Sequence, residues 1–248
     1  MYHQFKELAG VDITKESMEV GPTAHYMNGG IRVDADTAAT GVPGLYAAGE
    51  VAGGLHGSNR LGGNALSDLL VFGRRAGQHA ALYAKSLSGA PTTDTSRLDA
   101  YAREALRSFE STGTENPHAF QAELQETMQS LVGIIRTETE LQEALVRLGA
   151  YRQRLPQVRV EGGRAYNPGW HTALDMRALL TVAECVTRAA LERKESLGGH
   201  ARDDFPTADT RFASVNVVVR KRDETIITTL EPIREMPEEL RRLIEEKK

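Results

Sequence analysis

The sequence predicts an α+β protein in three parts, and three patterns along its 248 residues support this. Residues 1–66 are rich in glycine and contain short β-like runs, whereas residues from about 94 to 197 show helical periodicity. Near the C-terminus, two runs rich in β-branched residues flank a short charged turn. We therefore expect domains at 1–90, 91–197 and 198–248: a mixed α/β part, an antiparallel helical bundle, and a small β-hairpin and helix.

The first part is expected to hold two short strands and one helix. Residues 31–34 (IRVD) and 44–50 (GLYAAGE) are typical of strands, and a turn-forming stretch, DTAATGVPG, links them. From residue 65 to about residue 87 the apolar residues follow a helical period.

The middle part reads as a series of helices with recognisable starts. Asn116 followed by Pro117 predicts an N-cap with proline at the first helical position. Thr137 and Glu140 have the spacing of a capping box. A further helix is expected over 168–197, ended by the glycine pair at 198–199. Because the connecting loops are short and polar, we expect neighbouring helices to run antiparallel.

The last part changes character again. Residues 213–221 (ASVNVVVRK) and 224–232 (ETIITTLEP) predict a β-hairpin. The final stretch, PEELRRLIEEKK, predicts a short helix with glutamates in its first turn and lysines at its end, as the helix dipole favours.

Composition excludes several classes of function. A formal net charge of −4 argues against nucleic acid as the main partner. The single cysteine, Cys185, excludes an internal disulfide or a cysteine-based metal cluster in this chain, and we expect it to be an inert core thiol. No run approaches eighteen apolar residues and no charged-then-apolar leader is visible, so we expect neither a membrane span nor a secretion signal.

The stretch GLHGSNRLGGNAL, residues 54–66, is the strongest functional signal. It holds four glycines, a histidine and an arginine and then continues into a helical pattern. Glycine-rich turns before a helix place free backbone N–H groups where an anionic or flat ligand can approach.

Three motifs in fixed order identify the family. HYMNGGIRVD (25–34), PGLYAAGE (43–50) and LHGSNRLGGNALSDLLVFGRRAG (55–77) together closely resemble the end of the flavin-binding domain in the succinate dehydrogenase/fumarate reductase flavoprotein subunit. The helices at 94–155 resemble that family's helical domain, and ESLGGHARDDFP (195–206) resembles the segment before its C-terminal domain. The resemblance implies that residues 1–90 are the C-terminal part of an FAD-binding α/β domain. It also implies an FAD-dependent oxidoreductase that acts on the CH–CH group of a dicarboxylate and interconverts succinate and fumarate by hydride transfer to or from flavin.

One departure from the family pattern sets an expectation about the chain. The family's flavoprotein opens with a GxGxxG turn that takes the FAD pyrophosphate, and this sequence contains no GxGxxG. We therefore expect the chain to be the C-terminal part of a longer polypeptide that alone neither binds FAD tightly nor turns over substrate.

The resemblance also implies roles for particular residues. His25 and Arg60 correspond to substrate-binding residues, and an arginine suits a carboxylate because its planar fork donates two parallel hydrogen bonds. Glu50 corresponds to the acid that binds FAD hydroxyls. The start of the helix, Asn64, Ala65 and Leu66, would face the flavin ring through its backbone, although the family often has serine where this chain has Ala65.

Other polar residues carry weaker signals. His56 lies inside the motif, where loop support and ligand contact are both open, and no catalytic residue is assigned. We expect a charged turn between domains at His200, Arg202 and Asp203, with a role near the flavin domain as the alternative. The remaining histidines show no metal-ligand spacing, and we expect no metal site.

The family implies partners and a location. Electrons would pass through a separate iron–sulfur protein, and membrane-anchor subunits would attach the cytoplasmic protein to the inner face of the cell membrane.

Three alternatives stay open: a related flavoprotein such as L-aspartate oxidase, a truncated non-catalytic chain acting as an interaction module, and a generic helical-bundle binding protein. The last alternative leaves the first 66 residues unexplained.

Overall fold

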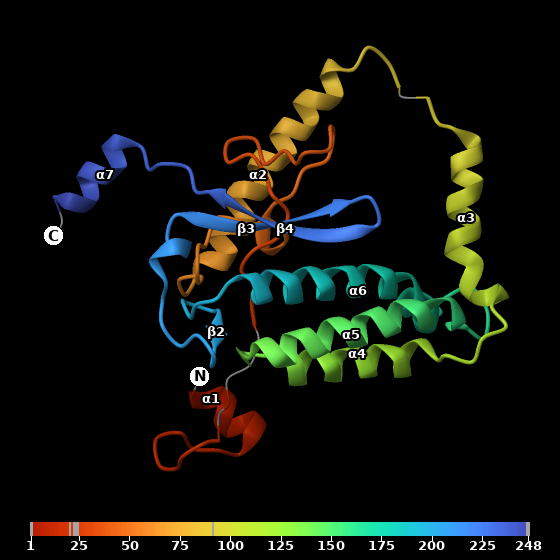
Figure 1. The fold of residues 1–248 in the computed structure, drawn as a ribbon, viewed down its shortest axis with the longest axis horizontal. Coiled ribbons are helices and arrows are strands. Elements are labelled where there is room, and N and C mark those ends of the chain that lie inside the picture. Colours follow the sequence, from red (N-terminus) through yellow and green to blue (C-terminus); the bar gives the residue numbers. More distant parts are fainter. Residues whose placement is uncertain (1, 20, 22–24, 91, 247–248) are drawn as a thin grey trace. The chain divides into compact units, whose positions relative to one another are not determined.

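The computed structural model describes residues 2–19, 21, 25–90 and 92–246 and has the predicted α+β character (Figure 1). The chain divides into two compact units, residues 1–81 and 82–248, each described below by itself. No helix within the described ranges has the length and apolar character needed to cross a bilayer.

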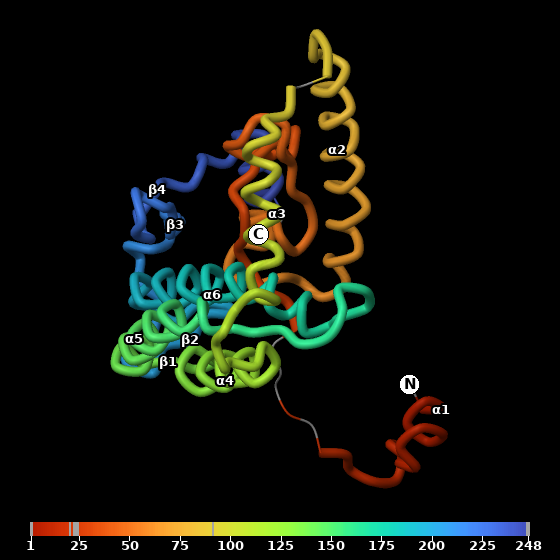
Figure 2. The backbone as a smooth tube through the Cα atoms, turned by 90° about the vertical axis from the view of Figure 1, so that its right-hand side faces the viewer, coloured from red at the N-terminus to blue at the C-terminus, as the bar shows by residue number. Residues whose placement is uncertain are grey.

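The first unit consists of turns, irregular segments and one long helix. Its short elements are α1 (Tyr2–Gln4), a π-helical turn (Phe5–Ala9) and a 3-10 turn (Gly49–Val51). The long helix α2 (Asn64–Ser86) confirms the predicted helix and runs as one continuous coil in Figure 2.

The two strands predicted at 31–34 and 44–50 are wrong. The structure has only isolated bridges there, Ile31 with Ala52 in parallel and Ala39 with Tyr46 in antiparallel. The Asp34 side chain explains the early end of the first run, because its Oδ1 accepts the backbone N–H groups of Asp36 and Thr37 and so folds the chain into an Asx-type turn.

The second unit is dominated by helices, and their predicted starts are confirmed. They are α3 (Thr95–Glu110), α4 (Pro117–Leu131), α5 (Glu138–Arg154) and α6 (Pro168–Glu192), with a 3-10 turn (Leu155–Gln157) after α5. The Asn116 side chain accepts the N–H groups at the start of α4, and Thr137 and Glu140 form both halves of a capping box. Helix α6 ends at Glu192 rather than 197, because the chain becomes extended from Arg193 onward.

Packing shows that α4, α5 and α6 run in alternating directions (Figure 1). One core cluster joins Phe120 at the start of α4, Tyr151 near the end of α5 and Met176 in the first half of α6. A second cluster joins Val132 after α4, Leu141 near the start of α5 and Ala190 near the end of α6. The predicted antiparallel bundle is therefore confirmed.

Short strands complete the second unit. Strands β1 (Ile135–Arg136) and β2 (Ala201–Arg202) pair in parallel. After a 3-10 turn (Thr210–Phe212), strands β3 (Val215–Arg222) and β4 (Thr225–Pro232) form the predicted antiparallel hairpin, which packs on α6 (Figure 2). The last helix, α7 (Glu238–Glu245), begins with glutamates as expected.

Candidate active site

Close backbone contact joins two segments of the first unit that carry predicted site residues. The Ile31 N–H donates to the Val51 carbonyl at 2.7 Å, and the Gly53 N–H donates to the Ile31 carbonyl at 2.9 Å. Gly30 has φ +143°, and a Cβ there would lie 2.3 Å from the Val51 oxygen, so only glycine permits this approach. The HYMNGG segment is thereby fixed against the turn that carries Glu50.

Glu50 presents its carboxylate at this junction. It lies in the 3-10 turn and is exposed, and its Oε1 accepts the Met27 N–H at 2.9 Å. A carboxylate can accept further hydrogen bonds, so Glu50 retains capacity for a hydroxyl donor. Gly49 keeps this turn close to α2, since a Cβ at that position would lie 2.5 Å from Cδ2 of Leu69.

Arg60 is half-buried and is held mainly by its own loop and one aromatic ring. Its N–H donates to Oδ1 of Asn59 at 2.9 Å, and its Nη1 donates to the Leu61 carbonyl at 3.3 Å. Its guanidinium carbon lies 4.7 Å from the centre of the Tyr26 ring, within cation–π range. Its Nε is buried and has no hydrogen-bond partner among the described residues, and the same holds for Oδ1 of Asn28.

Three polar side chains meet behind the Arg60 contact. The Tyr26 hydroxyl donates to Oδ2 of Asp68 at 3.2 Å, and Nε2 of His56 lies 3.1 Å from the same hydroxyl and 3.4 Å from Oδ2 of Asp68. The His56 and Asp68 side chains are 10% and 5% exposed, so this is a largely buried polar cluster. Burial, followed by the hydrogen bond to Asp68, raises the pKa of Tyr26, which keeps its hydroxyl protonated.

Sequence reasoning left His56 open and missed Tyr26 and Asp68. Two signals were present: Tyr26 directly follows the predicted His25, and Asp68 stands four residues after Asn64, on the same face of the helix. Asp68 is the buried residue of an otherwise exposed or half-buried helix, which is unusual for an acid.

A cavity of about 240 Å³ adjoins this cluster. It is lined by residues of the loop and the first turns of α2, namely Leu55, His56, Asn64, Ser67, Asp68, Val71 and Phe72. The predicted Asn64 therefore lies beside the cluster. Ala65 is half-buried and Leu66 is 71% exposed, at the start of α2. The first N–H groups of a helix have no acceptor within the helix. His25 is exposed and directly precedes Tyr26 in the chain.

These residues fit one side of a flat polar cofactor such as FAD. An exposed carboxylate suits ribityl or ribose hydroxyls, and a helix N-terminus suits an electron-rich ring edge. The buried Nε of Arg60 and Oδ1 of Asn28 are polar atoms that further groups could satisfy.

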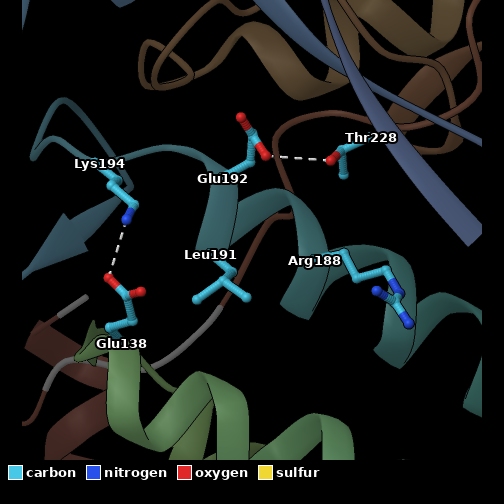
Figure 3. Close-up of a pocket in the computed structure, with 6 residues that line it drawn as sticks. All are labelled: Glu138, Arg188, Leu191, Glu192, Lys194 and Thr228. Carbon is cyan, nitrogen blue, oxygen red and sulfur yellow. Dashed lines mark hydrogen bonds and ion pairs between the residues drawn. The ribbon is translucent and has the colours of Figure 1, made fainter.

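The second unit contains a different cavity, of about 310 Å³, that involves no predicted site residue (Figure 3). Its charged groups pair with their neighbours: Nζ of Lys194 donates to Oε2 of Glu138 at 3.2 Å, and Oγ1 of Thr228 donates to Oε2 of Glu192 at 3.3 Å. We assign this recess no ligand.

The segment that was expected to be a charged turn, at His200, Arg202 and Asp203, contains a buried arginine. Arg202 is 1% exposed, and its Nε and Nη2 both donate to the Asp204 carboxylate at 2.7 Å. His200 is half-buried, with Nε2 at 2.8 Å from the Arg193 carbonyl and Nδ1 at 3.1 Å from Nη1 of Arg136. Cys185 is half-buried rather than fully buried, and burial raises the pKa of its thiol.

Comparisons with known proteins indicate a flavoprotein family. The family model of the fumarate reductase flavoprotein C-terminus matches residues 121–242, and that of an FAD-binding domain matches residues 1–66. The chain is 39% identical over 227 residues to a subunit of the CoM/CoB fumarate reductase of Methanothermobacter marburgensis, covering 92% of this chain and 41% of that protein. It is 37% identical over 225 residues to the fumarate reductase flavoprotein subunit of Mycobacterium tuberculosis, covering 87% and 38% respectively.

Solved structures give the same result. A Mycobacterium smegmatis Sdh1 structure in complex with UQ1 matches with a TM-score of 0.90 and 52% identity, over 98% of this chain and 42% of that one. A quinol–fumarate reductase structure with menaquinol molecules matches with a TM-score of 0.83 and 31% identity, over 95% and 42%. The chain thus spans about two fifths of the length of these relatives. The family predicted from the three motifs is confirmed: the chain belongs to the FAD-dependent succinate dehydrogenase/fumarate reductase flavoprotein family.

Proposed function

We propose that this chain supplies one wall of the active site of an enzyme that interconverts succinate and fumarate. The observation that carries the proposal is Arg60, whose guanidinium is held in a glycine-rich loop with a buried Nε that has no partner in the described part of the chain. An arginine in this state can bind a carboxylate without first breaking an existing ion pair.

In this proposal Arg60 and His25 bind the dicarboxylate. Arg60 donates paired hydrogen bonds to one carboxylate. His25, exposed next to Tyr26, donates a ring N–H to a carboxylate oxygen. Together they would fix the substrate's orientation and draw electron density from its central carbon–carbon bond.

Glu50 and the start of α2 would hold the FAD. Glu50 accepts hydroxyl hydrogen bonds, while the N-terminal end of α2 at Asn64, Ala65 and Leu66 favours negative charge on the ring. When bound, the flavin accepts or donates the hydride, and the protein's task is to orient and polarise.

The proposed role of Arg60 is tested by Arg60→Lys in the protein expressed from its complete reading frame. Lysine keeps the charge and loses the fork, so succinate oxidation should fall at least about a hundredfold while flavin content is unchanged. Arg75→Lys is the matched control, since Arg75 also contacts an aromatic ring, Phe72, and a carbonyl, that of Ala35. Normal succinate turnover by Arg60→Lys would remove Arg60 from the site. Faster turnover of L-aspartate than of succinate by the unaltered protein would favour the oxidase alternative instead.

We further propose that the three predicted domains, at 1–90, 91–197 and 198–248, are the functional divisions of the chain.

The protein would pass electrons to an iron–sulfur subunit, while anchor subunits would hold it at the inner face of the cell membrane. Support comes from the relatives, which are flavoprotein subunits, one of them solved with the ligand UQ1. Affinity purification from membranes, followed by iron analysis, tests this: recovery of the protein without iron would contradict the partner assignment.

A further inference from the structure

We propose that Tyr26 is a positioning residue for Arg60, and that His56 and Asp68 hold Tyr26 in place. The inference rests on the proposed role of Arg60 as the carboxylate-binding residue. In this arrangement the direction of the Arg60 guanidinium depends on the buried cluster of Tyr26, His56 and Asp68 as well as on the loop.

The contacts of Arg60 support this assignment. Its described hydrogen bonds go only to its immediate neighbours, Asn59 and Leu61, which move with the same loop. Tyr26 differs because it comes from a segment 34 positions earlier in the chain and offers its ring face 4.7 Å from the guanidinium carbon. A cationic fork lying against an aromatic ring is restricted in the directions it can take.

The ring itself is fixed at its far end. The Tyr26 hydroxyl has one proton, and Asp68 can only accept, so the 3.2 Å bond runs from Tyr26 to Asp68. The 3.1 Å contact then requires Nε2 of His56 to carry a proton and donate to the tyrosine oxygen. The rings of Tyr26 and His56 also meet edge to face, with centres 5.3 Å apart at 80°.

His56 and Asp68 therefore hold the Tyr26 hydroxyl, and the Tyr26 ring lies against the Arg60 guanidinium. The guanidinium, in the proposed function, binds the substrate. Asp68 sits on the first turns of α2 and His56 on the loop before it, so the rigid helix anchors the arrangement. Removing only the hydroxyl should keep the aromatic ring but release it from Asp68 and His56. The ring, and the Arg60 guanidinium that lies against it, should then be able to shift.

The experiment uses the protein from its complete reading frame, loaded with oxidised flavin, and measures the Kd of fumarate by calorimetry. Tyr26→Phe should raise the Kd of fumarate and the KM of succinate about tenfold, the effect of losing a hydrogen bond to a charged group, with flavin content unchanged. Tyr46→Phe is the matched control, because its hydroxyl also makes one hydrogen bond within the same unit, to the His79 carbonyl at 3.2 Å, away from Arg60.

A double variant decides whether Tyr26 acts through Arg60. In the Arg60→Lys background, Tyr26→Phe should change the Kd less than about twofold, because the fork that the ring positions is gone. If Tyr26→Phe raises the Kd of fumarate by the same factor with and without Arg60→Lys, the proposal is overturned. A Tyr26→Phe variant with the same Kd as Tyr46→Phe would also overturn it.

Two further results separate the possible failures. If Arg60→Lys binds fumarate normally, the proposed function of Arg60 fails; if Arg60→Lys weakens binding and Tyr26→Phe does not, only the positioning role fails. Should Tyr26→Phe lose flavin, Asp68→Leu replaces it, since leucine has a similar size and shape but no oxygen to accept the Tyr26 hydrogen bond. An Asp68→Leu variant with unchanged fumarate affinity would then overturn the proposal.

Discussion

Replacing Arg202 by methionine should strongly destabilise the second unit, although the sequence places Arg202 in a charged segment. The Arg202 side chain is 0% exposed and binds Asp204 through two donors. Its Nη1 also donates to the carbonyls of Ala190 and Leu191 near the C-terminal end of α6, at 2.8 and 3.4 Å. Its guanidinium therefore satisfies carbonyls that the helix leaves without internal donors.

The magnitude follows from what the substitution leaves behind. Methionine fills similar space but leaves a buried carbonyl without a donor, at about 1–3 kcal/mol, and removes the partner of the partly exposed Asp204 carboxylate, so we expect a loss of about 3 kcal/mol in the free energy of unfolding. Arg202→Lys keeps the charge with fewer donors and should lose less.

The assay is urea unfolding of the 248-residue chain, followed by the fluorescence of Trp170, the single tryptophan, which lies in α6. Arg211→Met is the matched control, because Arg211 also pairs with an acid two residues away, Asp209, but is 77% exposed. Equal losses for Arg202→Met and Arg211→Met would refute the reasoning, since surface ion pairs contribute little.

Acidification should remove part of the Arg202 effect. The hydrogen bonds from Arg202 lower the pKa of Asp204 from 3.8 to about 2. Because this pKa is depressed in the folded state, its stabilising contribution is present above pH 3.8 and is lost as the pH falls toward 2. The shift corresponds to about 2 kcal/mol, reduced to about 1 kcal/mol by water at this partly exposed carboxylate, so the difference between native and Arg202→Met protein should narrow by that amount at low pH.

Three other changes test the core, a buried histidine and the loop junction. Leu148→Ala should lower the free energy of unfolding by about 3 kcal/mol because Leu148 is 1% exposed, whereas Val146→Ala, at a position 74% exposed, should change it little in the same urea titration. Burial and neighbouring arginines lower the pKa of His200 below 6.5, so the unfolded state takes up its proton first and stability should fall from pH 7 to 5, by at most about 1.4 kcal/mol per pH unit; His200→Gln should flatten that dependence. Gly30→Ala should lower flavin content more than Gly29→Ala, since both have positive φ but only the former meets a carbonyl oxygen; equal flavin content in the two variants would contradict a steric role for the close approach.

Features decided by neighbouring residues were predictable from the sequence. The caps at Asn116 and Thr137 were found because the residues that form a cap lie within a few positions of each other. The hairpin β3–β4 was found because β-branched residues flank a short turn. The strands at 31–34 and 44–50 were mispredicted because β-propensity indicates only a residue's fit to a sheet, and in the described part of the chain each segment makes only an isolated bridge, Ile31 with Ala52 and Ala39 with Tyr46.

Features decided by tertiary contact were not predictable in the same way. Arg202 is read as a surface residue from its type, and only the position of the end of α6 explains its burial. Likewise, Tyr26 and Asp68 are 42 positions apart, so no local pattern indicates their hydrogen bond. Both residues lie inside the family motifs, but the sequence analysis assigned neither of them a role.

The loop at 54–66 illustrates how the arginine proposed to bind substrate can lie in so glycine-rich a sequence. Glycine gives the loop little stiffness of its own, and the described hydrogen bonds of Arg60 go only to its neighbours within it. Outside the loop, Arg60 contacts the Tyr26 ring, and the close backbone contact of Gly30 with Val51 fixes the segment that bears Tyr26. In the proposed role of Arg60, the glycines at 29–30 and the helix that begins at Asn64 would hold the glycine-rich loop between two fixed elements. Arg60 would then keep one orientation without an ion pair that a carboxylate would have to displace.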